Sequence, residues 1–218
     1  MIIQTRKPTA ERREEIAESV LKIIGERGLT SLTTTTIAEE VGLSSGALFR
    51  HFASRDEMLT EAVRFGLARI EDTFPDESLP PIDRLLELAR GRIRVLGSDA
   101  GLAWLFSSEQ ASLVLPEEAV TLLGEIVGRS RRYVLEALRE GAARGTIRRD
   151  IEPEMLLVPV MGTIHALIGA QGARQLSIGR AGKVSDPEPM LAALVRLIEP
   201  VGDESATPAA PEPTNTNE

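Results

Sequence analysis

Residues 30–55 read TSLTTTTIAEEVGLSSGALFRHFASR, and this stretch decides the fold. Its apolar residues recur four apart in two places, which predicts one short helix over about 34–41 and another over about 45–52. A three-residue turn over 42–44, which begins with a glycine, separates them. The inner faces of the two helices carry Ile37, Val41, Leu48 and Phe52. The spacing therefore predicts a helix-turn-helix.

Longer amphipathic helices flank this motif on both sides. The helix before it begins at Thr9 and stops at Gly28, and its apolar residues follow the i, i+4, i+7, i+8 spacing of one buried face. The helix after it opens with Ser54 and Glu57, the S-x-x-E pattern of a capping box. The two apolar faces consist of Ile16, Val20, Ile23 and Ile24, and of Leu59, Ala62, Val63, Gly66, Ile70 and Phe74.

The remainder of the chain predicts a larger helical bundle. Helical periodicity resumes after three prolines, over 82–97, 100–113, 117–144, 153–173 and 187–199. Alternating runs rich in Val, Ile and Thr are missing, so the fold class is all-α with about nine helices. We expect a helix-turn-helix unit over 1–54, a bundle over 55–200 joined to it by the long fourth helix, and a disordered tail over 201–218.

The composition excludes several classes of protein. With 218 residues, 42% of them hydrophobic, the chain can bury the core of one or two domains. Its net charge of −8 means that any binding to nucleic acid or to an anionic membrane must be local. The absence of cysteine excludes disulfides and thiolate metal sites, and two histidines cannot form a zinc site of three histidines. We therefore expect no metal and no cofactor.

One uncharged stretch, 155–173, is long enough to raise the question of a membrane-spanning helix. It contains a proline, several glycines and polar side chains, which favour a helix buried by protein instead. The first eight residues include Arg6 and Lys7 and lack the apolar run of a secretory signal. We therefore expect a cytoplasmic protein that does not enter a membrane.

The motif over 30–55 resembles the DNA-binding signature of the TetR family of bacterial transcriptional regulators. The likeness lies in the threonine-rich helix start, in Ile37, Ala38 and Val41, in the turn glycine, and in the segment from Ser45 to Phe52. With the flanking helices it covers about 9–74. It implies a DNA-binding domain over 1–54 and a domain over 55–200 that binds a ligand and dimerises. The bundle matches only in size and helix order, so the ligand is not implied.

The chemistry of the motif positions predicts which side chains contact DNA. Arg50 can bind guanine through two hydrogen bonds, Ser45 can bond either partner of a base pair, and Ala47 can contact a thymine methyl. Hydroxyls and N–H groups at the start of the first short helix can bind phosphate. The predicted contacts are Thr34, Thr35, Ser44, Ser45, Gly46, Ala47, Phe49, Arg50, His51 and Arg55.

Two observations complicate the prediction of these contacts, and alternatives remain open for three of the residues. Phe49 stands where the family commonly has tyrosine, and phenylalanine cannot bond to phosphate. Residues 1–64 hold nine Lys or Arg against ten Asp or Glu, so an N-terminal arm with Arg6 and Lys7 is expected to add contacts and binding should fall with salt. The alternatives stay open that His51 is structural and that Arg50 and Arg55 are solvated charges.

The bundle should hold a dimer and a ligand. A single short helix reads too few base pairs, so proteins of this kind pair as twofold dimers on palindromic operators. The expected dimer surface is Met161, Ile164, Ile168, Leu191, Leu194, Val195 and Ile198, although part of it can equally be the core of one chain. The expected ligand contacts are Phe65, Trp104, Phe106, Tyr133 and His165, although aromatic residues at helical spacing are more often core.

The function predicted from these observations is a homodimeric repressor that a small molecule releases from a palindromic DNA operator. A regulator that needs no ligand, or one that activates transcription, would have the same sequence features. A carrier or interaction bundle without DNA activity is the alternative of a different class. An enzyme is not expected, because the sequence motifs of hydrolases, zinc proteases and nucleotide-binding proteins are missing.

Overall fold

The computed structural model describes residues 8–108, 110–175 and 186–201. This part of the chain contains only helical elements, ten α-helices and one 3₁₀ helix (η1), which confirms the all-α class. The elements are α1 (Thr9–Arg27), η1 (Leu29–Ser31), α2 (Thr34–Glu40), α3 (Ser45–Leu48), α4 (Arg55–Glu71), α5 (Pro81–Ser98), α6 (Ala100–Ser107), α7 (Ala111–Val114), α8 (Glu117–Arg144), α9 (Pro153–Gln175) and α10 (Glu188–Ile198). The N-terminal arm and nearly all of the expected tail lie outside these residues.

Two helices differ from the prediction. The stretch over 100–113 forms two helices instead of one, because Ser108 takes an extended backbone conformation and ends α6. Regular helix in α3 stops at Leu48, and the chain continues to His51 as a turn that is held by the N–H groups of Arg50 and His51. The helix-turn-helix thus has a second helix of little more than one turn.

Hydroxyl side chains begin the three helices that follow α1. The side-chain oxygens of Thr33, Ser44 and Ser54 each accept the backbone N–H three residues later, at 3.1, 3.2 and 3.1 Å. Gly28 and Gly42 end α1 and the turn after α2 with φ angles of 78° and 65°, in the left-handed region that favours glycine. The predicted helix boundaries at these two glycines are confirmed.

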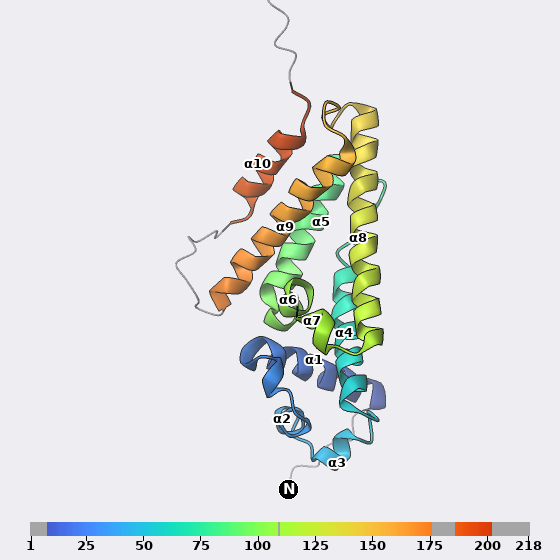
Figure 1. Cartoon of the computed structure of the whole chain (residues 1–218), viewed down its shortest axis with the longest axis vertical. Coiled ribbons are helices and arrows are strands. Elements are labelled where there is room, and N and C mark those ends of the chain that lie inside the picture. Colours follow the sequence, from blue (N-terminus) through green and yellow to red (C-terminus); the bar gives the residue numbers. More distant parts are fainter. Residues whose placement is uncertain (1–7, 109, 176–185, 202–218) are drawn as a thin grey trace, which may run out of the picture.

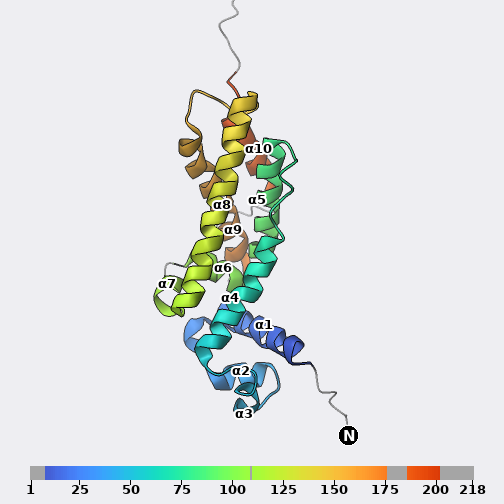
Figure 2. The same cartoon turned by 90° about the vertical axis from the view of Figure 1, so that its right-hand side faces the viewer.

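The helices form a head and a body, which α4 connects (Figure 1). The head consists of α1 to α3 and the start of α4, and α3 lies at its tip. In the body, α5, α8 and α9 pack side by side and α10 packs against α9. Figure 2 shows α8 running along the body, beside α4 at the end near the head. The head therefore projects from one end of the bundle.

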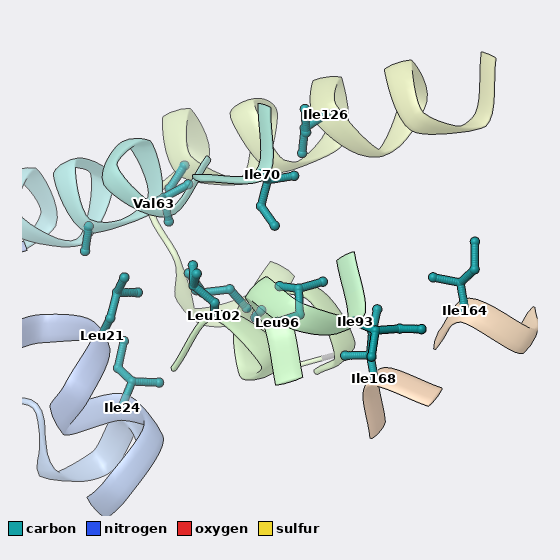
Figure 3. Packing of buried hydrophobic residues seen from close by; sticks show 14 of the residues in the cluster. Leu21, Ile24, Val63, Ile70, Ile93, Leu96, Leu102, Ile126, Ile164 and Ile168 are labelled. Atoms are coloured by element: carbon teal, nitrogen blue, oxygen red, sulfur yellow. The ribbon is translucent and has the colours of Figure 1, made fainter. Parts of the chain in front are cut away.

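One hydrophobic core runs from the head into the body. Leu21 and Ile24 of α1 meet Leu102 of α6, and the core continues to Ile93 of α5 and Ile164 of α9 (Figure 3). α1 packs mainly against α4 and α6, so α6 joins the head to the body. A change in the position of α6 can therefore be transmitted to α1 directly.

The uncharged stretch in α9 is long enough for a membrane span but does not qualify as one. No helix in the described ranges is long and apolar enough to cross a membrane. Leu156, Val160 and Leu167 on α9 are buried by the rest of the chain. Protein burial therefore accounts for its apolar residues on that side.

Candidate nucleic-acid interface

α3 and the turn after it present one face to the core and another to solvent. Leu48 and Phe52 are 0% and 1% exposed, as predicted for the inner face. Ser45, Phe49 and Arg50 are exposed, and 47% of the surface of Phe49 is accessible to solvent. An exposed helix with a guanidinium and a hydroxyl, held on an apolar base, has the chemistry to read base edges in a major groove.

Ala47 does not belong to this exposed face. The predicted contact with a thymine methyl requires Ala47 to face solvent, and this placement is wrong, because Ala47 is 8% exposed. Its N–H is also bound by the side chain of Ser44. Ser44 therefore acts as the N-cap of α3, while Gly46 lies exposed on the first turn.

In the threonine run over 33–36, two residues cap α2 and the other two lie at its first turn. Thr33 and Thr36 exchange two hydrogen bonds, backbone N–H to side-chain oxygen in each direction, and so cap α2. Thr34 is half-buried and Thr35 is exposed at the first turn. The helix start that would bind phosphate is therefore in place, and contact of Thr34 and Thr35 with DNA stays a prediction.

The side chains of Arg55 and His51 are both partly held or covered by the protein itself. The Nε of Arg55 donates to the carbonyl of Leu32 at 3.1 Å, which ties the start of α4 to the segment before α2. The ring Nδ1 of His51 is buried and has no hydrogen-bond partner among the described residues. Arg55 thus makes a structural contact and His51 is partly buried, and the contacts of both side chains with DNA stay predictions.

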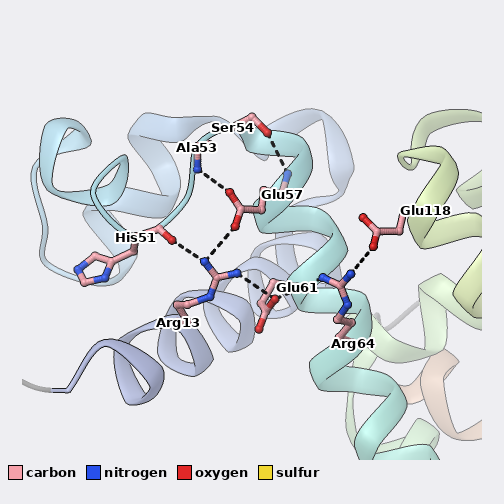
Figure 4. Close-up of polar contacts among 8 residues, drawn as sticks. All are labelled: Arg13, His51, Ala53, Ser54, Glu57, Glu61, Arg64 and Glu118. Atoms are coloured by element: carbon pink, nitrogen blue, oxygen red, sulfur yellow. Dashed lines mark hydrogen bonds and ion pairs between the residues drawn. The ribbon is translucent and has the colours of Figure 1, made fainter.

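Arg13 of α1 links this helix to the turn after α3 and to α4 (Figure 4). Its Nη1 donates to the carbonyl of His51 at 2.6 Å and to Glu57 at 3.0 Å, and its Nη2 donates to Glu61 at 3.1 Å. The guanidinium also lies 4.1 Å from the centroid of the Phe52 ring. One cation therefore joins α1, the end of the α3 turn and α4.

The carboxylates around Arg13 extend this network. The backbone N–H of Ala53 donates to Glu57 at 2.6 Å, and this bond together with Arg13 lowers the pKa of Glu57. The capping box predicted at Ser54 is thus altered, since Glu57 receives the N–H of Ala53 and not that of Ser54. Arg64, which pairs with Glu61, also pairs with Glu118 at the start of α8 (Figure 4).

Other cations of the head are neutralised away from α3. Lys22 and Arg27 of α1 both pair with Glu40 of α2, at 2.5 and 2.9 Å. These exposed pairs link α2 to α1 and place a carboxylate beside both cations, which weakens the positive field that Lys22 and Arg27 can offer to DNA. The acidic composition of the head is therefore partly used in its own packing.

The five predicted ligand contacts lie on four different helices. Phe65 on α4 and Trp104 and Phe106 on α6 are partly buried against the core. Tyr133 on α8 is buried, and its hydroxyl donates to the carbonyl of Pro75 at 3.0 Å. His165 is exposed on α9, and partial loss of hydration with the charge of Arg92 lowers its pKa. Their role in ligand binding stays a prediction.

The side chains predicted for a dimer surface are mostly used within one chain. Packing of α9 against α5 and of α10 against α9 buries five of them, which are Ile164, Ile168, Leu191, Leu194 and Ile198. For these five the predicted dimer contact is wrong, and the alternative that they belong to the core of one chain holds. Met161 and Val195 remain partly exposed. In the described ranges, no three His, Asp or Glu side chains come close enough to hold a metal ion.

Comparisons with known proteins agree with this arrangement. Residues 16–62 match the family model of bacterial regulatory proteins, tetR family. The chain is 27% identical over 149 residues to the HTH-type transcriptional repressor KstR2 of Mycobacterium tuberculosis, which covers 66% of this chain and 74% of that protein.

Solved structures show the same fold. The ketosteroid transcriptional regulator KstR2 of Mycobacterium tuberculosis superposes with a TM-score of 0.66 at 22% identity, over 86% of this chain and 95% of that one. AibR in complex with isovaleryl coenzyme A and operator DNA superposes with a TM-score of 0.65 at 17% identity, over 86% and 98%. KstR2 is named as a transcriptional repressor, and the AibR structure contains operator DNA.

Proposed function

The chain belongs to the TetR family of bacterial regulatory proteins, and from this premise we propose that it is a homodimeric DNA-binding repressor that a small molecule releases from its operator. The observation that carries the proposal is that α3 lies at the tip of the head, with exposed Ser45 on this helix and exposed Arg50 in the turn that follows it. We assign 1–54 to DNA binding and 55–200 to ligand binding and dimerisation. Since the partner is bacterial DNA, we place the protein in the cytoplasm.

Selection of bound sequences from random duplex DNA tests this function. At about 0.1 M salt, the full chain should enrich a palindromic motif, because a twofold dimer presents two α3 helices to the duplex. A metabolite extract that contains the effector should abolish the enrichment. Failure to enrich any motif would favour the carrier without DNA activity.

Arg50→Ala should weaken binding to the selected operator by about 1–3 kcal/mol, because it removes a bidentate contact to a base. Binding to random DNA should change much less, so the loss is one of specificity. Fluorescence anisotropy with operator and scrambled duplexes measures both. Arg94→Ala, which removes an exposed arginine from α5 in the body, is the matched control and should leave both affinities unchanged. An equal loss on both duplexes would assign Arg50 to the phosphate backbone.

An apolar stripe on α9 supports the proposed dimer. Met155 and Val158 are 68% and 73% exposed, and the stripe continues at helical spacing through exposed Gly162, Ala166 and Gly169. Small residues allow two helices to approach closely. We propose that this stripe, and not the buried residues of α9 and α10, pairs with its copy in the second chain.

Val158→Glu should dissociate the dimer, because a twofold interface would bury the new carboxylate in both chains beside an apolar surface. The expected loss is about 3 kcal/mol, or roughly a hundredfold in the dimer dissociation constant. Light scattering with size-exclusion chromatography measures it at micromolar protein. Leu113→Glu on α7, where Leu113 is 83% exposed, is the control and should remain dimeric. A dimeric Val158→Glu protein would place the interface elsewhere.

The effector can release DNA only by binding one arrangement of the two heads more tightly than the other. Moving a dimer population from 99:1 to 1:99 needs about 5.5 kcal/mol of differential binding. In AibR, one structure contains both isovaleryl coenzyme A and operator DNA, which supports a combined DNA and ligand function for this chain. The contact of α6 with α1 is the route by which we expect the body to move the head.

A further inference from the structure

Two arginines of α5 are buried to the same extent but differ in their partners. Arg84 and Arg92 are 6% and 7% exposed. Arg84 pairs with the carboxylate of Glu140 on α8. The Nη2 of Arg92 donates to the hydroxyl of Ser130 at 3.0 Å, and within the described ranges no carboxylate lies at ion-pair distance from it. Arg92 is therefore a buried cation whose hydrogen-bond partner is neutral, whereas Arg84, two turns away on the same helix, is paired with an anion.

The surroundings of Arg92 carry an excess of positive charge. Its guanidinium lies 4.8 Å from the centroid of the Phe74 ring, and the guanidinium of Arg129 lies 4.4 Å from the same centroid. Arg129 has a carboxylate partner in Glu71. Loss of hydration, together with the smaller effect of Arg129, lowers the pKa of Arg92 to about 10, even though Glu71 acts in the opposite direction.

An unpaired guanidinium in a dry interior is costly, and a carboxylate or phosphate is the group that best compensates it. The planar guanidinium can offer such an anion two parallel N–H donors. The residues one turn to either side of Ser130 on α8 are Ile126 and Val134, both buried and apolar. On its α8 side, an anion that reaches Arg92 would thus lie beside apolar residues.

We propose that Arg92 binds the anionic head group of the effector, a molecule that joins a carboxylate or phosphate to an apolar body. This assignment rests on the proposed function and adds the chemical class of its ligand. Phe74, whose ring contacts Arg92, also lines a hollow of about 300 Å³ together with Tyr133, with two arginines, Arg129 and Arg132, and with three glutamates, Glu71, Glu77 and Glu136. Solvent therefore comes within one aromatic ring of the guanidinium.

Calorimetric titration of the full chain without DNA tests the assignment. The probes are alkyl carboxylates, alkyl phosphates and the neutral alkyl alcohols of the same length, from four to twelve carbons. At the best chain length, one of the two anions should bind at least tenfold more tightly than the alcohol. The tighter of the two anions identifies the head group as carboxylate or phosphate. Equal binding of anion and alcohol at every length would overturn the proposal.

Arg92→Met separates an anion site from a structural arginine. The variant should reduce the preference for the anion to less than twofold, and its Tm without ligand should be equal or higher, because an apolar side chain replaces an unpaired buried charge. Arg94→Met, the same change at an exposed position of α5, should retain the tenfold preference. Arg92→Lys should retain part of it. A large fall in Tm, or an unchanged preference in Arg92→Met, would overturn the proposal.

The two proposals can fail separately. If the anion binds at Arg92 but does not release operator DNA, the proposed ligand response is wrong and the anion site stands, though not as an effector site. If a neutral compound releases the DNA and no anion binds, the assignment of Arg92 is wrong and the repressor function stands.

Discussion

Replacing Gly101 by alanine should lower the free energy of unfolding by about 3 kcal/mol, the upper part of the range for overpacked cores. A Cβ atom at this position of α6 would lie 2.1 Å from the carbonyl oxygen of Leu21 and 2.7 Å from its carbonyl carbon. These are backbone atoms of α1, which cannot rotate away as the end of a side chain can. The methyl group must therefore push α6 away from α1 and open the joint between head and body.

Urea denaturation followed by circular dichroism measures the loss. Gly124→Ala on α8 is the control, because no atom from outside its own stretch of helix backbone lies within 4 Å of a Cβ there. Its unfolding free energy should rise by up to about 1 kcal/mol, the helix propensity difference between glycine and alanine. If Gly101→Ala were as stable as the unchanged chain, α6 could move along α1 without cost, and the proposed route from body to head would lose its support.

Phe52→Ala should destabilise the head by about 3–5 kcal/mol, the range for removing a buried aromatic side chain. The ring of Phe52 is 1% exposed, and the guanidinium of Arg13 lies 4.1 Å above it. Without the ring, the turn after α3 loses its apolar base and Arg13 loses one of its contacts. DNA binding should disappear with the order of α3.

Phe49→Ala provides the matched control, three residues earlier in the same segment. Phe49 is 47% exposed, so its removal should change the unfolding free energy by no more than about 0.5 kcal/mol. Thermal and urea unfolding of both variants measure the difference. A Phe52→Ala protein that unfolds like Phe49→Ala would show that the head does not depend on this ring.

The head could be predicted closely because its signals are local. Cap residues, two glycines and the spacing of Leu48 and Phe52 each act over three or four residues, and all of them are found in the structure except one half of the capping box at Ser54. The position of Ala47 could not be predicted because a helix of four residues has only about one turn, too few to separate a buried face from an exposed one by spacing. Local spacing therefore predicts where the helices of the head lie, but it does not predict the direction of every side chain.

The body was less predictable because its contacts are made between distant segments. The sequence shows that α9 is apolar, yet it does not show which side meets α5 and which side is left exposed. Arg13 and Arg92 were missed for a related reason. Each stands at an inner-face position of its helix, Arg13 three residues before Ile16 and Arg92 four residues after Leu88, and a charge at such a spacing is the signal that would have found them.

Trp104 is the only tryptophan of the chain, and it lies half-buried on α6, the helix that contacts α1, α5 and α9. The emission wavelength of an indole depends on how much water surrounds it. Tryptophan fluorescence of the unlabelled protein therefore comes from one place, the joint between head and body. The emission of this one tryptophan should therefore respond both to a ligand bound in the body and to an operator bound at the head.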